Sequence, residues 1–308
     1  MRIIFLGTPL FAVEVLNSIY KSDNELVAVI TQPDKVNGRS GKITYGPVKQ
    51  YALEHEIDIL QYDNISLEGE SEIRKLNPDI MVTCAYGQIL KQNILDICPI
   101  INVHASILPK YRGSSPVQWA LINGESFVGV TIMRTELGVD TGDMILKDGI
   151  ILHGDENSAE VLESLSKVGA KLIVKALEEI KKGTAEYEKQ NEIEATYCRM
   201  LTKADGKIDF NLSALQIKNF IRGVTPWPGA YTHCVNGNIK ISKVEVCEYE
   251  GGECPGEVVA SDFKKGLIVK CGSGYISVLN LQGENSKAMD IKSYLLGKKI
   301  PVGSILGD

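Results

Sequence analysis

The first half of the chain alternates short, largely apolar runs with longer stretches of helical periodicity. The runs lie at residues 3–6, 26–30, 79–84 and 100–104. Continuous apolar strands that alternate with helices are typical of a parallel sheet covered on both faces. Gly7-Thr8-Pro9 predicts a turn, with Thr8 near the N-cap and Pro9 as the first residue of a helix that continues to about Tyr20. Because ligands bind outside the carboxyl ends of such strands, we expect the functional site just after these runs.

The pattern of the second half is different. A helical stretch at 158–181 precedes a polar segment at 184–191, and the chain beyond Lys207 contains five short strand-like runs, at 230–235, 239–246, 256–260, 267–271 and 276–281. Asn236-Gly237 is a typical two-residue hairpin turn. The predicted fold class is α/β, with a Rossmann-like, mostly parallel sheet domain at 1–189, a linker at 190–206 and a small OB-like β-barrel domain at 207–308.

The charge of the chain limits the kinds of partner it can have. In 308 residues, 33 Lys and Arg stand against 39 Asp and Glu, a formal net charge of −6. This balance argues against a protein that coats nucleic acid through a general positive field. Residues 1–206 carry a net −8 and residues 207–308 a net +2, so the acidity belongs to the first domain.

The seven cysteines indicate the compartment. None forms a Cys-x-x-Cys pair, their number is odd, and histidines at zinc-ligand spacing are absent. We therefore expect reduced thiols in a cytoplasmic protein and no metal site. No segment approaches the roughly 18 apolar residues that a membrane span requires, so no membrane partner is expected.

Candidate chemistry lies at the end of the fourth apolar run. Asn102 and His104 are two residues apart on a predicted strand, so their side chains leave it on the same face. They can converge on one reacting carbon, or they can be a strand-end pair that hydrogen-bonds into turns. Asp140 lies between Gly138 and Gly142, which allow a tight loop, and its carboxylate can orient an imidazole or form an ordinary Asx turn. The three groups together favour a catalytic site.

Seven segments, in order over nearly the whole chain, resemble the methionyl-tRNA formyltransferases, a branch of the formyltetrahydrofolate-dependent transferases. The Asn-x-His and Asp residues alone are typical of the wider family. The Gly-Thr-Pro at 7–9 and the Trp-Pro-Gly-Ala at 227–230 are specific to the tRNA branch. The segments are 5–12, 31–34, 86–90, 102–109, 138–143, 226–231 and 303–307.

The resemblance implies an activity for the candidate site. The family transfers the formyl group of 10-formyltetrahydrofolate, a co-substrate, to the α-amino group of methionine on initiator tRNA. By this resemblance Asn102 donates to the developing oxyanion, and Asp140 orients His104 or a water that relays protons. His104 either donates to the oxyanion or takes the proton that the attacking ammonium loses, and the sequence leaves both roles open. Because the chain contains no Gly-x-Ser-x-Gly elbow and no cysteine in a nucleophile motif, we expect direct transfer.

The resemblance also implies a folate pocket. Its predicted residues are Ser106, Ile107, Leu108 and Pro109 on one segment and Gly87, Gln88, Ile89 and Leu90 on another. Backbone hydrogen bonds suit a planar pterin and apolar side chains suit its faces, although core packing also explains Ile89, Ile107 or Leu108 taken singly. The single glycine of Gly7-Thr8-Pro9 is not the Gly-x-Gly-x-x-Gly of a dinucleotide fold, which disfavours NAD and FAD.

Initiator methionyl-tRNA is the second partner that the resemblance implies. The long loop at 32–46 carries Lys35, Arg39 and Lys42, and the family inserts this loop into the acceptor stem. Arg39 matches the family's key arginine, although the loop here is less basic than is common. Lys203 and Arg222 are further predicted phosphate contacts, while solvated charges are the default interpretation of both. A monomer is expected.

Two other kinds of function are considered. The first is a formyltransferase that acts on a nucleotide or sugar-nucleotide amine. The purine enzyme would not need a barrel after the catalytic domain, and the sugar-nucleotide enzyme would be expected to carry a second Rossmann domain. The second is a non-catalytic RNA-binding protein that uses a decayed catalytic domain as a scaffold. The presence of Asn102, His104 and Asp140 argues against it.

Overall fold

The computed structural model describes residues 1–37 and 42–307 and divides the chain into two compact units. The first unit contains residues 1–116, 127–151 and 162–198. The second contains 117–126, 152–161 and the chain from Arg199 onward. The domain boundaries expected from the sequence stay a prediction, and these units differ from them because two short internal segments, 117–126 and 152–161, belong to the second unit.

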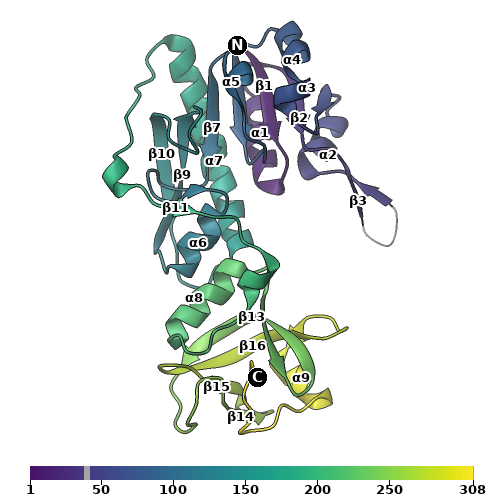
Figure 1. Ribbon diagram of the computed structural model, residues 1–308, viewed down its shortest axis with the longest axis vertical. Coiled ribbons are helices and arrows are strands. Elements are labelled where there is room, and N and C mark those ends of the chain that lie inside the picture. The colour runs from purple at the N-terminus through teal and green to yellow at the C-terminus, as the bar shows by residue number, and fades with distance from the viewer. Residues whose placement is uncertain (38–41, 308) are drawn as a thin grey trace. The chain divides into compact units, whose positions relative to one another are not determined.

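The first unit is built on a seven-stranded sheet in the order β10-β9-β7-β6-β1-β2-β5 (Figure 1). Five strands are parallel neighbours, and β9 and β10 extend one edge antiparallel. The strands are β1 (Arg2–Gly7), β2 (Glu25–Thr31), β5 (Ile59–Gln61), β6 (Ile80–Cys84), β7 (Ile100–His104), β9 (Phe127–Arg134) and β10 (Met144–Ile151). The predicted mostly parallel α/β sheet is confirmed, while the antiparallel pair was not expected.

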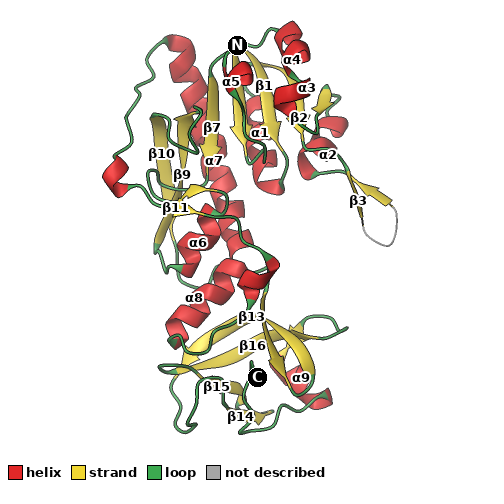
Figure 2. Cartoon of the chain, in the orientation of Figure 1, coloured by secondary structure: helices red, strands yellow, loops and turns green. Residues whose placement is uncertain are grey.

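Helices cover both faces of this sheet (Figure 2). Ile4 and Leu6 of β1 share a core cluster with Ile65, Ile73 and Ile94 on one face. On the other face, Gly169 of α7 lies against Val103, Val15 and Val130. The helices are α1 (Leu10–Tyr20), α2 (Pro47–Glu54), α3 (Ile65–Glu68), α4 (Glu70–Leu76), α5 (Gln92–Leu95) and α7 (Ser158–Lys182), whereas α6 (Pro116–Ile122) belongs almost entirely to the second unit. A sheet that is covered on both faces buries the side chains of a strand in both directions. This explains why the apolar run of β1 is continuous.

The start of α1 differs from the prediction. Pro9 is the N-cap and Leu10 the first helical residue, and no side chain caps the helix. Thr8 instead accepts a hydrogen bond from the Gln32 N–H (3.3 Å) and donates to the Tyr86 carbonyl (3.4 Å). Its hydroxyl thus joins the loops that follow three neighbouring strands.

The second unit has an antiparallel sheet in the order β12-β13-β16-β15-β14, with β17 paired to β16. Its strands are β12 (Ala230–Cys234), β13 (Gly237–Cys247), β14 (Val258–Asp262), β15 (Gly266–Lys270), β16 (Tyr275–Gly283) and β17 (Met289–Asp290). All five predicted strands are confirmed with small shifts of their ends. The predicted hairpin is also confirmed, but the pairing of Cys234 with Gly237 sets its turn at Val235-Asn236, one residue earlier than expected.

Two helices of the second unit were not predicted. α8 (Ala214–Val224) begins at a capping box in which Ser213 accepts from the Gln216 N–H and Gln216 bonds back to Ser213. Ile217, Ile221 and Val224 then pack into the core of the sheet. α9 (Ile291–Gly297) begins at Asp290, whose carboxylate accepts from the Ser293 N–H. The residues that cap the two helices, Ser213 with Gln216 and Asp290, are sequence signals for the start of a helix.

Short elements complete the fold. They are the hairpin β3 (Lys35–Asn37) and β4 (Lys42–Thr44), the parallel pair β8 (Arg112–Gly113) and β11 (Tyr197–Cys198), and the 3-10 turns η2 (Glu192–Glu194) and η3 (Lys203–Gly206). All seven cysteines are free thiols. Of the helices in the described part of the chain, none is long and apolar enough to cross a membrane.

Gly113 makes the pairing of β8 with β11 possible. Its φ is +116°, and a Cβ built on it would overlap the Cys198 carbonyl oxygen. Gly154 has a similar φ of +99° but open space around its Cα. The two glycines therefore separate backbone strain from steric overlap.

We expect Gly113→Ala to lower the free energy of unfolding by about 1–3 kcal/mol more than Gly154→Ala, because only the first adds a clash to the strain that both share. Urea unfolding of the two variants beside the wild type measures the difference. Equal losses would show that close approach to Cys198 does not constrain the fold.

Candidate active site

The site is built at the carboxyl end of β7, between β6 and β9. Asn102 of β7 lies in register with Thr83 of β6, and His104 lies in register with Thr131 of β9. Alternation along the strand turns Asn102 and His104 to the same face, as the spacing predicted. His104 is buried and Asn102 half-buried, so both side chains are held by the sheet.

The carboxylate of Asp140 joins both side chains. Its Oδ1 accepts from Asn102 Nδ2 at 3.4 Å, and its Oδ2 lies 3.5 Å from His104 Nδ1. Oδ2 also accepts from the Gly113 N–H at 2.8 Å. The structure therefore brings together all three residues that the sequence predicted as catalytic. The contact with Gly113 was not predicted.

The ring of His104 has a defined orientation. Its Nε2 lies 2.9 Å from the Tyr111 carbonyl oxygen. Because a carbonyl only accepts hydrogen bonds, Nε2 carries a proton there, and we assign the tautomer on that ground. Nδ1, beside Asp140, is then the ring nitrogen that carries the lone pair.

Thr83 orients the amide of Asn102. The Thr83 hydroxyl donates to Asn102 Oδ1 at 2.9 Å, which directs Nδ2 to the side of Asp140. One N–H of Nδ2 bonds to Asp140, and the second makes no hydrogen bond to any described residue. That N–H can donate to a ligand. Thr83 was not predicted, because the sequence of one strand does not show which residue of the neighbouring strand lies beside it.

The loop that carries Asp140 is tight, and glycine was expected to allow it. The residue with the left-handed backbone is Asp140 itself, whose φ is +53°. Gly142 is needed because a Cβ there would overlap the carbonyl oxygen of Arg134. Asp tolerates the left-handed region better than most residues, so the catalytic candidate also makes the turn.

Thr131 holds the segment 106–109 through two hydrogen bonds. The Thr131 hydroxyl donates to the Ser106 carbonyl at 2.7 Å and accepts from the Leu108 N–H at 3.1 Å. The Ser106 hydroxyl is used within the segment, because it donates to the Lys110 carbonyl at 2.6 Å. Leu108 is buried in a cluster with Met133 and Met144, whereas Ile107 and Pro109 are partly exposed.

The segment 87–90 divides into structural and open parts. Gln88 accepts from the Ile65 N–H and donates to the Tyr62 carbonyl, both at 2.9 Å, and Leu90 is buried in the core. Their side chains therefore stabilise the fold. Ile89 is 76% exposed, and a Cβ on Gly87 would meet a single atom, Gln32 Nε2, at 3.8 Å. The open surface here is backbone and one apolar side chain.

The predicted cationic residues lie in different settings. Lys35 and Lys203 are exposed. Arg39 lies outside the described residues. For Lys42, the structure describes the backbone, which belongs to β4, and not the side chain. Within the described residues, no group of three His, Cys, Asp or Glu side chains is close enough to hold a metal ion.

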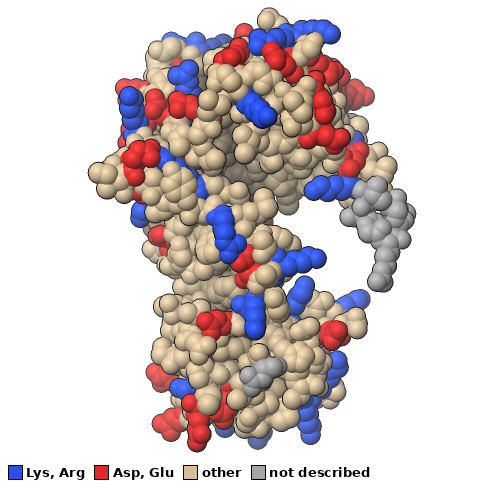
Figure 3. All heavy atoms as spheres, in the orientation of Figure 1, with Lys and Arg blue, Asp and Glu red and all other residues tan. Residues whose placement is uncertain are grey.

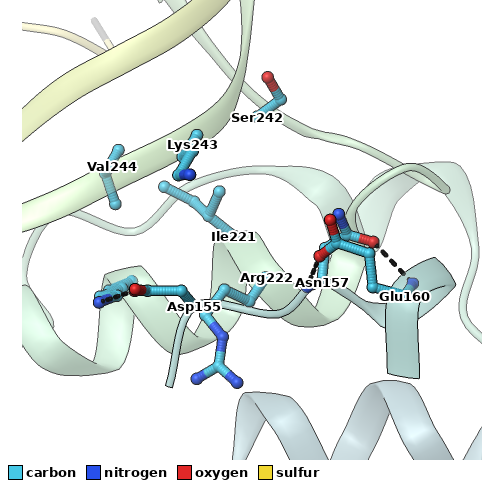
Figure 4. Close-up of a pocket in the computed structure, with 9 residues that line it drawn as sticks. Asp155, Asn157, Glu160, Ile221, Arg222, Ser242, Lys243 and Val244 are labelled. Carbon is cyan, nitrogen blue, oxygen red and sulfur yellow. Dashed lines mark hydrogen bonds and ion pairs between the residues drawn. The ribbon is translucent and has the colours of Figure 1, made fainter. Parts of the chain in front are cut away.

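Arg222 does not suit the phosphate contact predicted for it. It is 9% exposed, and its guanidinium donates to the Glu156 carbonyl (2.8 Å) and to Asn219 Oδ1 (3.0 Å). Figure 4 shows the pocket that it lines together with Asp155, Asn157, Glu160 and Lys243; the guanidinium points away from Lys243. Arg222 therefore fastens the turn before α7, and burial lowers its pKa.

Comparisons with known proteins agree on one kind of enzyme. Residues 1–177 match the formyl transferase family and 200–299 its C-terminal domain. The chain is 44% identical to the methionyl-tRNA formyltransferase of Caldanaerobacter subterraneus subsp. tengcongensis, over 99% of this chain and all of that one.

Solved structures share the fold at low identity. An N-formyltransferase from Helicobacter canadensis, in complex with folinic acid and dTDP-3-aminofucose, has a TM-score of 0.68 at 22% identity, covering 90% of this chain and 98% of its own. HypX from Aquifex aeolicus, in complex with tetrahydrofolic acid, has a TM-score of 0.64 at 16% identity, covering 96% of this chain and 47% of its own.

The turn that Arg222 fastens is sensitive to acid. Burial raises the pKa of Glu156, but the backbone N–H groups of residues 153–156 outweigh it and lower that pKa to about 2. A carboxyl whose pKa is depressed by folding stabilises the folded state above its unfolded value, near 4.5, and loses that contribution as the pH falls towards 2.

We expect Glu156→Gln to lower the free energy of unfolding at pH 7 by about 1–3 kcal/mol, because charge-assisted hydrogen bonds are lost. The difference from wild type should shrink as the pH falls below 4.5. Thermal unfolding between pH 7 and pH 3 measures it, with Glu186→Gln, an exposed position, as the control. A difference that is independent of pH would contradict the role of the Glu156 charge.

Proposed function

The chain belongs to the methionyl-tRNA formyltransferase family, and we propose that it formylates the α-amino group of methionine on initiator tRNA, with 10-formyltetrahydrofolate as co-substrate. One observation carries the proposal. Asn102, His104 and Asp140 converge at the end of β7, in a chain that is similar to a methionyl-tRNA formyltransferase along 99% of its length.

The residues next to the site fit a folate. The co-substrate supplies the formyl group. Among the described residues, the backbone groups of 87–90 have no hydrogen-bond partner, and Ile89 exposes an apolar side chain beside them. Free backbone donors and acceptors suit the edge of a pterin, and an apolar side chain suits its face. We propose that 87–90 and the partly exposed Ile107 and Pro109 hold the folate. Ser106 and Leu108 would fix the conformation of the segment 106–109.

Asn102 acts as the hydrogen-bond donor of the reaction. Its uncommitted Nδ2–H is fixed in direction by Thr83 and Asp140, so it can donate to negative charge on the formyl oxygen without reorganising. A donor that is already oriented stabilises the transition state more than the ground state. Removal of such a donor typically lowers the rate by about 10² to 10³.

His104 accepts the proton that the attacking amine loses. The attacking amine must lose a proton, and Nδ1 is the ring nitrogen that Tyr111 leaves free for the transfer. Asp140 Oδ2, at 3.5 Å, stabilises the imidazolium that results. We therefore favour the role of base for His104 over the role of oxyanion donor that the sequence left open. Nδ1 can return the proton when the folate amine leaves.

A few placed cations, rather than a broad field, would hold the tRNA. In Figure 3, the visible face carries both basic and acidic side chains, and the net charge of the chain is −6. The exposed Lys35 and Lys203, and on the family resemblance Arg39 and Lys42, are the proposed contacts. Arg222 is left out because its side chain is buried. The cytoplasmic location and the monomeric state stay predictions.

The reaction itself is the direct test. Purified protein is incubated with 10-formyltetrahydrofolate and either initiator or elongator methionyl-tRNA. Formylation of the initiator in preference to the elongator supports the proposal. Formylation of a dTDP-amino sugar instead would favour the nucleotide-sugar alternative. Binding of tRNA without formylation would favour the non-catalytic RNA-binding alternative.

We expect Asn102→Ala to lower turnover by about 10² to 10³, because it removes the oriented donor. The affinity for tRNA should stay near that of wild type, since Asn102 is half-buried in the sheet. Single-turnover rates and filter binding measure the two quantities. Equal losses in both would rule out the donor role.

A further inference from the structure

The backbone of the Asp140 loop is held by a residue that is far away in the sequence. Gln190 Nε2 donates to the carbonyl oxygens of Asp140 and Gly142, each at 2.8 Å. An amide nitrogen has two N–H groups, so this pair of bonds uses both of them. Gln190 lies at the start of the segment predicted as a linker, between α7 and η2.

Arg112 fixes the orientation of the Gln190 amide. Arg112 Nε donates to Gln190 Oε1 at 2.9 Å. Because arginine only donates, Oε1 must face it and Nε2 must face the loop. Arg112 is 0% exposed. Its remaining donors bond to both carboxylate oxygens of Glu192 (2.7 and 2.9 Å) and to the Tyr197 hydroxyl (3.0 Å).

The same short strand therefore holds Asp140 in two ways. The Gly113 N–H donates to the Asp140 carboxylate, and the side chain of Arg112, the preceding residue, acts on the Asp140 carbonyl through Gln190. Asp140 has a φ of +53°, a conformation that costs an L-residue about 1–2 kcal/mol and persists where the surroundings enforce it. The two bonds from Gln190 supply that enforcement at the backbone.

We propose that Gln190, oriented by Arg112, is a positioning residue for the formyl transfer. Its amide holds the Asp140 backbone in the left-handed conformation that directs the carboxylate towards Asn102 and His104. Gln190 makes none of the proposed contacts with substrate, so it acts through Asp140. This inference rests on the proposed function.

Two substitutions at one position test the role of the amide. Gln190→Glu keeps an oxygen that accepts from Arg112 but has no N–H for the two carbonyls. Gln190→Met keeps a similar length without charge or donors. Gln282→Glu is the matched control, because Gln282 Nε2 also donates to a backbone carbonyl (Ser286, 2.8 Å) but lies in the second unit.

We expect both Gln190 variants to lower kcat by about 10- to 100-fold, because a small misplacement of the Asp140 carboxylate disorders the site. KM for methionyl-tRNA and for the folate should stay within about twofold of wild type, since the binding segments are untouched. Both variants should fold, although the loss of two hydrogen bonds should lower the thermal midpoint of each. The control should match wild type in kcat.

Each other outcome has a defined meaning. An unchanged kcat, a rise in KM alone, or failure of both Gln190 variants to fold would overturn the positioning role; the last would make Gln190 a structural residue. If the wild type itself formylates neither methionyl-tRNA, the proposed function fails instead. Assaying wild type and variants together keeps the two failures distinct.

Discussion

The carboxylate of Asp140 is the point where separate parts of the first unit meet. It accepts hydrogen bonds from the Asn102 side chain and the Gly113 backbone and faces the His104 ring. A carboxylate that is half-buried among donors has a well-defined position, because each oxygen has a partner that another element holds. This one group lies next to both the amide and the imidazole.

The surrounding structure serves to keep that group in place. Parallel register sets Thr83 beside Asn102, and the Asp140 carboxylate, which only accepts hydrogen bonds, faces the Nδ2 of the amide. The paired strands β8 and β11 need Gly113, because any side chain there would overlap the Cys198 carbonyl. Behind the loop, Gln190 bonds to two carbonyls. The polar side chains at the site are thus each oriented by a second residue, which is the arrangement that preorganised catalysis requires.

Continuous apolar runs predicted four of the five parallel strands but not β5 (Ile59–Gln61), and the alternation of side chains along a strand predicted the shared face of Asn102 and His104. The strands β9 and β10 were missed. β9 is a buried, largely apolar run that could have been predicted, whereas β10 mixes apolar residues with Lys147 and Asp148. Thr83 and Gln190 could not be predicted, because their roles arise from cross-strand register and from contacts about 20 and 50 residues apart. Arg222 was predicted to contact a phosphate because the sequence alone does not show that this charged side chain is buried.

Asp140 is the anchor that Asn102 and His104 share, and one substitution isolates that role. Asp140→Asn preserves shape and one acceptor for Gly113 but removes the charge that faces His104. The decisive measurement is the single-turnover rate of formyl transfer to initiator methionyl-tRNA at saturating substrates. We expect a loss of about 100-fold or more, with tRNA affinity unchanged. A rate near that of wild type would contradict the anchoring role of Asp140.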